Sequence, residues 1–516
     1  MENVSLAMQI FNTFSGGRTP GQQDLPAGKM FQILEDPFGL WCHFHAPKEE
    51  AVEEPNLYEN LRGKTDRLVR NNWIYNHCPN PVVISGSESE KFLKTLQAMQ
   101  AGADGIIGGN LWDLRQSEGV YGGVNFLLKI SSGQSIFGAY HYKIVQLKRA
   151  GEMKEHYALQ TALLNEILTA IQGYDAGEAL FIFKAKEQIL TCERVIERAR
   201  KTSALYQAIR KGEIVPEAQK PPKAALTPWR SYANKYVFDK HDLVLIPHLN
   251  TTMRAILREN SINTYDDIVT AGFERIKELL TDPTYPDNTP VLTYAHALAF
   301  LNNKPVLRSK GKFPPPEKKR NLYFDFEATE TFKENNTSFI YLIGVWDREV
   351  DKFIPFIAKE EKEEETIFKQ FADYVKSCGP DVALYHWTEY EVKKMKKLQE
   401  KYPAIKTELE YLVSVCLDLK IAVERAFYLP APSLSLKAAA PALGFHWRQT
   451  DCGAMDSMVY FTKWLKTGDE TALNKVLMYN EDDCVAMLKV ELALRDLQAR
   501  GEILEIVEIL PTNDAD

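Results

Sequence analysis

Long apolar runs are absent from the sequence. No stretch of its 516 residues approaches the roughly 18 consecutive apolar positions that a transmembrane helix requires. The N-terminus also lacks a basic region that leads into a long apolar stretch, which is the pattern of a secretory signal peptide. We therefore expect neither a membrane span nor a signal peptide, and we predict a cytoplasmic protein.

Cysteine is scarce, and an excess of positive charge is missing. The seven cysteines are scattered and include no Cys-x-x-Cys pair, which argues against a disulfide framework and against a zinc ribbon. The net charge of −8 means that no global positive field attracts nucleic acid, so any such binding must depend on local basic patches. Hydrophobic content of 45% and charged content of 26% are typical of a globular chain, and the length predicts about three domains.

Residues 1–200 show the patterns of a mixed α/β domain. The periodicity predicts a helix over Glu88–Gln100, a strand pair over Val120–Ile130 and Ala139–Leu147, and an amphipathic helix over His156–Ile171. We therefore expect an N-terminal α/β domain in a multidomain α/β protein.

The polar residues of this strand pair and helix resemble those of the RecB-like PD-(D/E)xK nucleases. In that family the positions of Asn125 and Gln146 are normally acids that hold a metal ion, whereas Lys148 and Gln160 match the pattern. A neutral amide oxygen does not replace carboxylate charge at a hard-cation site, so the resemblance implies a degenerate nuclease domain. A strand pair with a snorkelling lysine explains Lys148 equally well. Relatives often carry an iron–sulfur cluster, but the cysteine spacing predicts none here.

Three connecting segments follow the N-terminal domain. Residues 201–224 form a charged helix and linker, and 225–305 form a helical connector that only weakly resembles a helix-hairpin-helix module because the turn glycines are absent. Residues 306–320 are basic and proline-rich. This last segment either attracts phosphates or is simply a solvated linker.

Two carboxylates stand two residues apart in an apolar strand at the start of the final domain, residues 321–516. Because strand side chains alternate, Asp325 and Glu327 share one face, whereas apolar residues take the other face: Leu322, Phe324 and Phe326. Neighbouring buried carboxylates cost free energy unless a cation lies between them, and a divalent metal ion would serve. The alternative is a half-exposed strand with solvated acids.

Further acids and the order of the elements extend this pattern. Glu391 opens a helix after a strand over Val382–Trp387, and Tyr479 and Asp483 lie four apart in a helix over 470–499, so both point the same way. Three strands precede these elements: Leu322–Glu327, Phe339–Trp346 and Lys352–Ala358. Strands followed by helices in alternation predict a mixed sheet with helices on both faces.

The order of these residues resembles the DEDD-type 3′–5′ exonucleases, in their tyrosine-bearing subgroup on a ribonuclease-H-like fold. The stretches from Ser433 to Lys437, around Trp447, and from Tyr479 to Cys484 are similar to the exonuclease domain of a two-part bacterial family whose N-terminal part is RecB-like. The resemblance implies hydrolysis of phosphodiester bonds with two divalent ions.

The resemblance also implies a role for each residue. Asp325 would bridge both ions, Glu327 and Asp483 would hold the first, and Glu391, where aspartate is usual, would support the second. Tyr479 would orient or deprotonate the attacking water. Because every ligand atom is oxygen, Mg²⁺ or Mn²⁺ is expected over zinc.

The leading hypothesis is a metal-dependent 3′–5′ exonuclease acting on single-stranded nucleic acid, DNA more than RNA, with an inactive N-terminal domain that binds substrate or a partner. One alternative makes both domains active, and another makes the chain a non-catalytic nucleic-acid-binding protein. A complete set of five site residues favours the enzyme: Asp325, Glu327, Glu391, Tyr479 and Asp483. No motif reports contacts to a 2′-hydroxyl or to a protein partner.

Overall fold

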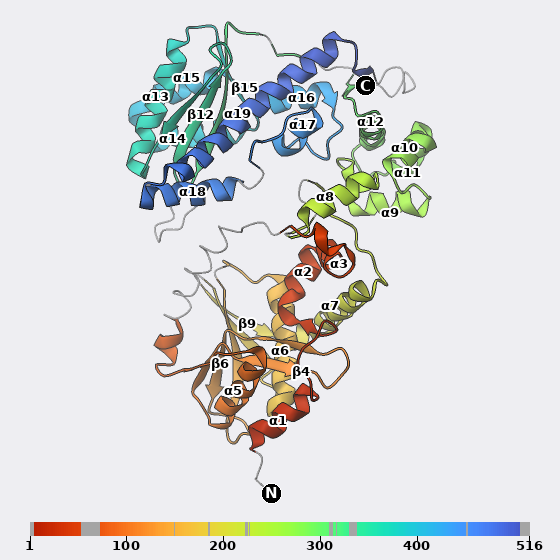
Figure 1. Cartoon of the computed structure of the whole chain (residues 1–516), viewed down its shortest axis with the longest axis vertical. Coiled ribbons are helices and arrows are strands. Elements are labelled where there is room, and N and C mark those ends of the chain that lie inside the picture. The colour runs from red at the N-terminus through yellow and green to blue at the C-terminus, as the bar shows by residue number, and fades with distance from the viewer. Residues whose placement is uncertain are drawn as a thin grey trace. The chain divides into compact units, whose positions relative to one another are not determined.

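The computed structural model forms two compact units, one containing most of residues 1–233 and the other most of residues 234–516 (Figure 1). They are called here the N-terminal unit and the C-terminal unit. The residues that the structure describes are 5–52, 73–148, 150–183, 186–221, 225–226, 228–308, 313–315, 317–329, 338–449 and 453–505. None of the helices within these ranges has the length and apolar character needed to cross a membrane.

The N-terminal unit is built on a six-stranded sheet. Its strands lie in the order β2 (Val82–Val83), β3 (Gly105–Ile107), β6 (Phe126–Ile130), β7 (His141–Leu147), β8 (Glu178–Ile182) and β9 (Glu187–Thr191). Strands β3, β6 and β7 pair antiparallel, whereas β7 and β8 are parallel and are joined by the crossover helix α6 (Glu155–Gln172). A smaller sheet has the order β1 (Leu25–Pro26), β5 (Val120–Gly123) and β4 (Asn110–Asp113).

The predicted elements of this unit are confirmed except for one strand. Helix α5 spans Glu88–Gln100 as predicted and begins with a capping box between Ser87 and Glu90. The predicted strand Val120–Ile130 was wrong, because it is two strands that belong to different sheets, β5 with β4 and β6 with β7. Glycines 122 and 123 end β5, since they offer no side chains to pack in a continuing strand.

The N-terminal unit also contains α1 (Leu6–Ser15), α2 (Met30–Glu35), α3 (Pro37–His45), α7 (Glu193–Lys211) and the first turn of α8 (Arg230–Asp239). Helix α7 continues through residue 200, where the composition suggested a domain boundary. Six cysteines are free thiols, and Cys452 lies outside the described residues.

The C-terminal unit contains a five-stranded mixed sheet. Its order is β13 (Lys352–Ile357), β12 (Ile340–Asp347), β11 (Arg320–Ala328), β14 (Val382–His386) and β15 (Cys416–Asp418). The central strand β11 is antiparallel to β12 and parallel to β14. The two acids predicted on one strand therefore lie in the middle of the sheet.

Helices cover both faces of this sheet, as predicted (Figure 1). Leu322, Phe324 and Phe326 pack in a core with residues of α13 (Glu364–Ser377), α14 (Tyr390–Lys401) and α15 (Lys406–Ser414). The opposite face, which bears Tyr323, Asp325 and Glu327, is covered by α16 (Leu419–Ala426), α17 (Leu436–Ala442), α18 (Ala454–Thr467) and the long α19 (Glu470–Ala499).

The segment before the sheet is helical, as predicted, with α9 (Thr251–Glu259), α10 (Tyr265–Ala271), α11 (Phe273–Leu280) and α12 (Thr289–Asn302). A small sheet follows, in the order β16 (Phe427–Tyr428), β10 (Val306–Leu307) and β17 (Leu504–Glu505).

Two cations of the basic segment 306–320 are held in ion pairs. Arg320 is the first residue of β11, and its guanidinium Nε donates a hydrogen bond to Asp347 at 2.9 Å. The Lys318 ammonium lies 3.1 Å from Asp381. Residues 309–312 and 316 lie outside the described residues. Asp347 is fully buried, which favours a structural role for Arg320, whereas the Lys318 pair is exposed and leaves the role of Lys318 open.

Candidate functional site

Three carboxylates meet on the face of the sheet that α19 covers. Asp325, Glu327 and Asp483 each bring one carboxylate oxygen within 4.8 Å of the others. Helix α19 packs across β11 and β12, so Asp483 reaches the two strand acids from a distant part of the chain. Glu327 is 5% exposed and Asp483 is 8% exposed. Asp325 is partly exposed, which leaves the cluster accessible. Carboxylate oxygens are the ligand type that hard divalent cations prefer.

Burial and mutual repulsion raise the pKa values of this acidic cluster. The pKa of Asp325 lies well above its ordinary value because of burial first and the charges of Asp483 and Glu391 next. Burial, followed by the charge of Asp483, raises the pKa of Glu327 to about 8. Burial also raises the pKa of Asp483, although Lys437 opposes the shift. A divalent ion would reverse this balance by favouring the ionised carboxylates.

Lys437 and Trp447 hold the Asp483 carboxylate. The Lys437 Nζ and the Trp447 Nε1 donate to the same oxygen, Oδ1, at 2.8 and 2.7 Å. The Lys437 ammonium also lies 3.9 Å from the Trp447 ring centroid and 4.3 Å from the Tyr479 ring centroid, within the range of cation–π attraction. The sequence pointed to Lys437 and Trp447 only through family resemblance, and their contacts with Asp483 were missed.

Tyr479 lies beside the acidic cluster, on the same side of α19 as Asp483. Its side chain is buried, and its hydroxyl lies close enough to the Asp483 carboxylate to lower the pKa of that acid. The predicted spacing of four residues therefore does bring this tyrosine and this acid together.

Asp325 is supported from the next position of α19. The Asn480 Nδ2 donates to Asp325 Oδ2 at 3.0 Å, and the Asn480 side chain is fully buried. Gly344 stands opposite Asp325 in β12, and a Cβ placed there would lie 1.6 Å from Asn480 Oδ1. The absence of a side chain at residue 344 therefore leaves the space that Asn480 occupies. A glycine inside a predicted strand was the available signal for this close approach.

Glu327 is fixed by two buried hydroxyl groups. The Tyr341 hydroxyl of β12 donates to Glu327 Oε2 at 3.3 Å and lies 2.7 Å from the Ser457 Oγ of α18. Both hydroxyl groups favour the ionised form of Glu327 and partly offset the effect of burial on its pKa. Neither contact was visible in the sequence, because the three residues belong to different elements.

Glu391 lies near the acidic cluster but is not one of its three members. It occupies the first turn of α14, is 6% exposed, and accepts a hydrogen bond from Thr388 Oγ1 at 3.4 Å. The His386 Nδ1 lies 3.7 Å from Glu391 Oε2. Burial raises the pKa of Glu391 to about 7. Its charge in turn raises the pKa of Asp325, so it faces the same region.

The acids that precede Asp483 serve a different purpose. The backbone N–H of Arg448 donates to Asp482 at 2.8 Å, and its guanidinium donates to Asp482 at 2.6 Å and to Glu481 at 2.7 Å. These bonds hold the segment around Trp447 against α19. Of three consecutive acids, only Asp483 belongs to the acidic cluster.

The N-terminal positions do not form a comparable acidic group. Asn125 Oδ1 accepts from the Leu147 N–H at 3.1 Å, and the Gln146 side chain is buried with no partner for Nε2 among the described residues. The Lys148 ammonium lies 4.6 Å from the Tyr157 ring centroid. No hydrogen bond between described residues joins Gln160 to the other three. The described part of this unit has no cluster of three potential metal ligands.

The comparisons with known proteins concern the C-terminal unit. Residues 322–494 match the family model of the RNase_H superfamily. This range contains the whole acidic cluster together with Glu391 and Tyr479, so the C-terminal unit holds a ribonuclease-H-like domain. No curated protein and no solved structure matched the chain.

We predict that the metal-free protein loses stability as pH rises. Glu327 and Glu391 have folded-state pKa values of about 8 and about 7, above the ordinary value of 4.5. Each therefore contributes stability that is fully present below its unfolded pKa and is lost as pH rises through the folded value. In chelator, the melting temperature should fall between pH 5.5 and 8.5, and Mn²⁺ should reduce that fall.

Glu327→Gln should reduce the fall in melting temperature with rising pH. Glu400→Gln, at an exposed position of α14, should leave that fall unchanged. The same melting curves for Glu327→Gln and the parent would contradict this account of the cluster.

We predict that Gly344→Ala disrupts the support of Asp325. The added methyl group meets Asn480 Oδ1, and overpacking of a buried site costs about 1–3 kcal/mol of unfolding free energy. Thermal unfolding should show this loss, and Gly344→Ala combined with Asn480→Ala should recover part of it. Gly151→Ala, where a Cβ has open space, is the control. Equal stability of the two alanine variants would refute the packing argument.

Proposed function

We propose that the C-terminal unit is a metal-dependent 3′–5′ exonuclease that hydrolyses phosphodiester bonds of single-stranded nucleic acid, with DNA preferred over RNA. The observation that carries the proposal is the cluster of Asp325, Glu327 and Asp483, of which the last two are buried, with Glu391 and Tyr479 beside it. The RNase_H superfamily match supports a nuclease. Direction and sugar preference rest on the resemblance to the DEDD-type exonucleases.

The donor set fits divalent metal ions. Asp325, Glu327 and Asp483 would hold one ion, and Asp325 with Glu391 would hold the other. All four side chains offer only oxygen, which favours Mg²⁺ or Mn²⁺ over zinc. When bound, the ions would neutralise charge that develops on the phosphodiester and would lower the pKa of water at the site.

The chain itself supplies a positioned hydroxyl group and a positive charge. The Tyr479 hydroxyl lies near the Asp483 carboxylate, where it can orient the attacking water or accept its proton. The Lys437 ammonium fixes the Asp483 carboxylate and would attract the phosphate of a bound strand. Three further side chains serve as positioning residues. Asn480 donates to Asp325, Tyr341 donates to Glu327, and the Ser457 hydroxyl hydrogen-bonds to that of Tyr341.

The N-terminal unit is proposed to be a degenerate RecB-like domain that binds without cleaving. Asn125 and Gln146 supply amides where catalysis would require carboxylates, and Asn125 is engaged with the backbone of Leu147. The absence of an acidic cluster from the described residues of this unit supports inactivity over the alternative of two active domains.

We predict that Asp325→Asn reduces degradation to background while the protein stays folded, because it removes a ligand charge and keeps the shape of the side chain. The assay uses 5′-labelled single-stranded DNA and RNA with Mn²⁺, Mg²⁺ or chelator. A ladder of shortened labelled products indicates 3′–5′ direction, and immediate release of the label indicates the opposite direction. Asp373→Asn, on the exposed side of α13, is the matched control.

Full activity of Asp325→Asn, or cleavage by the parent protein in chelator, would refute the assignment. Circular DNA extends the same assay to the N-terminal unit. Metal-dependent nicking that survives Asp325→Asn but disappears with Lys148→Ala would show that this unit is active.

We predict that Tyr479→Phe lowers the turnover rate by about 10²–10⁴-fold, the range of general acid–base contributions, while substrate binding persists. The substitution removes the hydroxyl group and keeps the ring that lies against Lys437. Single-turnover rates and binding constants separate the two effects. Tyr411→Phe on α15 should leave both unchanged, and an unchanged rate for Tyr479→Phe would restrict Tyr479 to packing.

A further inference from the structure

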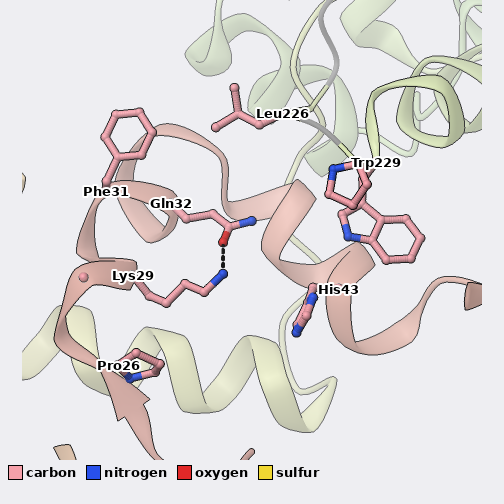
Figure 2. A pocket seen from close by; sticks show the side chains of 9 residues that line it. Pro26, Lys29, Phe31, Gln32, His43, Leu226 and Trp229 are labelled. Carbon is pink, nitrogen blue, oxygen red and sulfur yellow. Dashed lines mark hydrogen bonds between the residues drawn. The ribbon is translucent and has the colours of Figure 1, made fainter. Parts of the chain in front are cut away.

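The N-terminal unit contains a cavity of about 510 Å³, a size that suits a small-molecule ligand (Figure 2). It lies between the start of α2, helix α3 and the segment that contains Leu226 and Trp229. No carboxylate belongs to its lining, which includes Lys29, Gln32 and His43. This cavity is separate from the acidic cluster and from the positions that resemble a nuclease site.

Hydrogen-bond donors converge on the cavity. The Lys29 Nζ donates to Gln32 Oε1 at 2.7 Å. The Lys29 ammonium can only donate hydrogen bonds, so the oxygen of the Gln32 amide must face it. The nitrogen of that amide therefore points into the cavity, toward Trp229 (Figure 2).

The Trp229 indole supplies a second donor. Trp229 is 3% exposed, and its Nε1 has no hydrogen-bond partner among the described residues. The indole nitrogen lies on the edge of the ring that faces Gln32 and His43 (Figure 2). A buried N–H without an acceptor costs free energy, so an acceptor supplied by a ligand would be favourable.

Positive charge accompanies these donors. Burial lowers the pKa of Lys29, and within the described residues no carboxylate forms an ion pair with it. Burial and the neighbouring charges of Lys29 and Lys48 lower the pKa of His43. The Lys48 ammonium lies 5.7 Å from the Trp229 ring centroid and adds to the local positive charge. A cation that is partly removed from water without a counterion is stabilised by an anionic ligand.

An exposed aromatic ring borders the same cavity. Phe31 is 42% exposed, although it packs edge-on against His156 with a centroid distance of 5.0 Å. Its face offers a surface on which a nucleobase can stack. The donors and the positive charge on one side of the cavity suit the phosphate of a nucleotide. The exposed aromatic ring on another side suits its base.

We propose that this cavity binds the phosphate group of a nucleotide, with Lys29, Gln32 and Trp229 as donors to the phosphate and Phe31 against the base. A phosphate monoester offers several acceptor oxygens and up to two negative charges, which suits a set of donors that has no carboxylate. The nucleotide is either free in solution or the phosphorylated end of a strand. The proposal does not depend on catalysis at the acidic cluster.

Calorimetric titration of the full-length protein in chelator tests the site. The probes are dAMP, deoxyadenosine, inorganic phosphate, and a short oligonucleotide with and without a 5′-phosphate. Parent protein should bind dAMP at least about tenfold more tightly than deoxyadenosine, because hydrogen bonds to charged groups are worth about that ratio. It should also bind dAMP more tightly than inorganic phosphate. Tighter binding of the phosphorylated oligonucleotide than of dAMP assigns the site to strand ends, and the reverse assigns it to free nucleotides.

Lys29→Gln and Trp229→Phe should each weaken dAMP binding by about tenfold or more, since each removes one donor or charge and keeps much of the side chain. Lys201→Ala on the exposed side of α7 is the matched control. Loss of dAMP binding in Asp325→Asn would place the ligand at the acidic cluster and would overturn the proposal. Circular dichroism verifies folding, and Gln32→Leu replaces Trp229→Phe if that variant unfolds.

Several results would overturn the proposal. One is the absence of dAMP binding by the parent protein, and another is equal affinity for dAMP and deoxyadenosine. Unchanged affinity in both Lys29→Gln and Trp229→Phe would also exclude this cavity. Equal affinity for inorganic phosphate and dAMP would reduce the site to an anion site without base recognition.

Discussion

Repulsion between buried carboxylates is the constraint on which the C-terminal unit depends. Asp325, Glu327 and Asp483 are gathered within 4.8 Å, and burial together with their mutual charges raises their pKa values. Such an arrangement is costly in a folded protein unless a cation or a proton compensates it. The surrounding packing must therefore oppose the tendency of the three acids to separate.

The support for the acids comes from the sheet and from the helices and the loop on one of its faces. Asn480 binds Asp325 and fills the space above Gly344, whereas Lys437 and Trp447 converge on one oxygen of Asp483. These contacts involve side chains that are themselves buried or held by neighbours, which limits the geometries that the acids can adopt. Preorganisation of this kind is what a metal site needs from its surrounding shell.

The candidate sites of the two units concentrate charge of opposite sign. In the C-terminal unit, negative charge is concentrated and Lys437 is the cation that contacts the acidic cluster in the described structure. In the N-terminal unit, the cavity near Lys29 gathers donors and positive charge with no carboxylate in its lining. The first arrangement is suited to cations and the second to anions. A net charge of −8 for the whole chain conceals this local separation.

Local periodicity allowed much of the C-terminal domain to be predicted. Alternation placed Asp325 and Glu327 on one face of a strand, and the spacing within 470–499 placed Tyr479 and Asp483 on one side of a helix that spans those residues in the structure. Patterns of this kind depend on residues close in sequence. The catalytic roles that the family resemblance implied stay predictions.

Packing between distant segments decided the rest. The sequence alone could not show that Asn480 fits over Gly344, that Lys437 and Trp447 share one oxygen of Asp483, or that Val120–Ile130 divides between two sheets. It also could not show Trp229 beside Lys29, because these residues are about two hundred positions apart and neither belongs to a recognisable motif. Strand alternation and helix period are properties of the local backbone, whereas these contacts exist only once the elements have packed against one another.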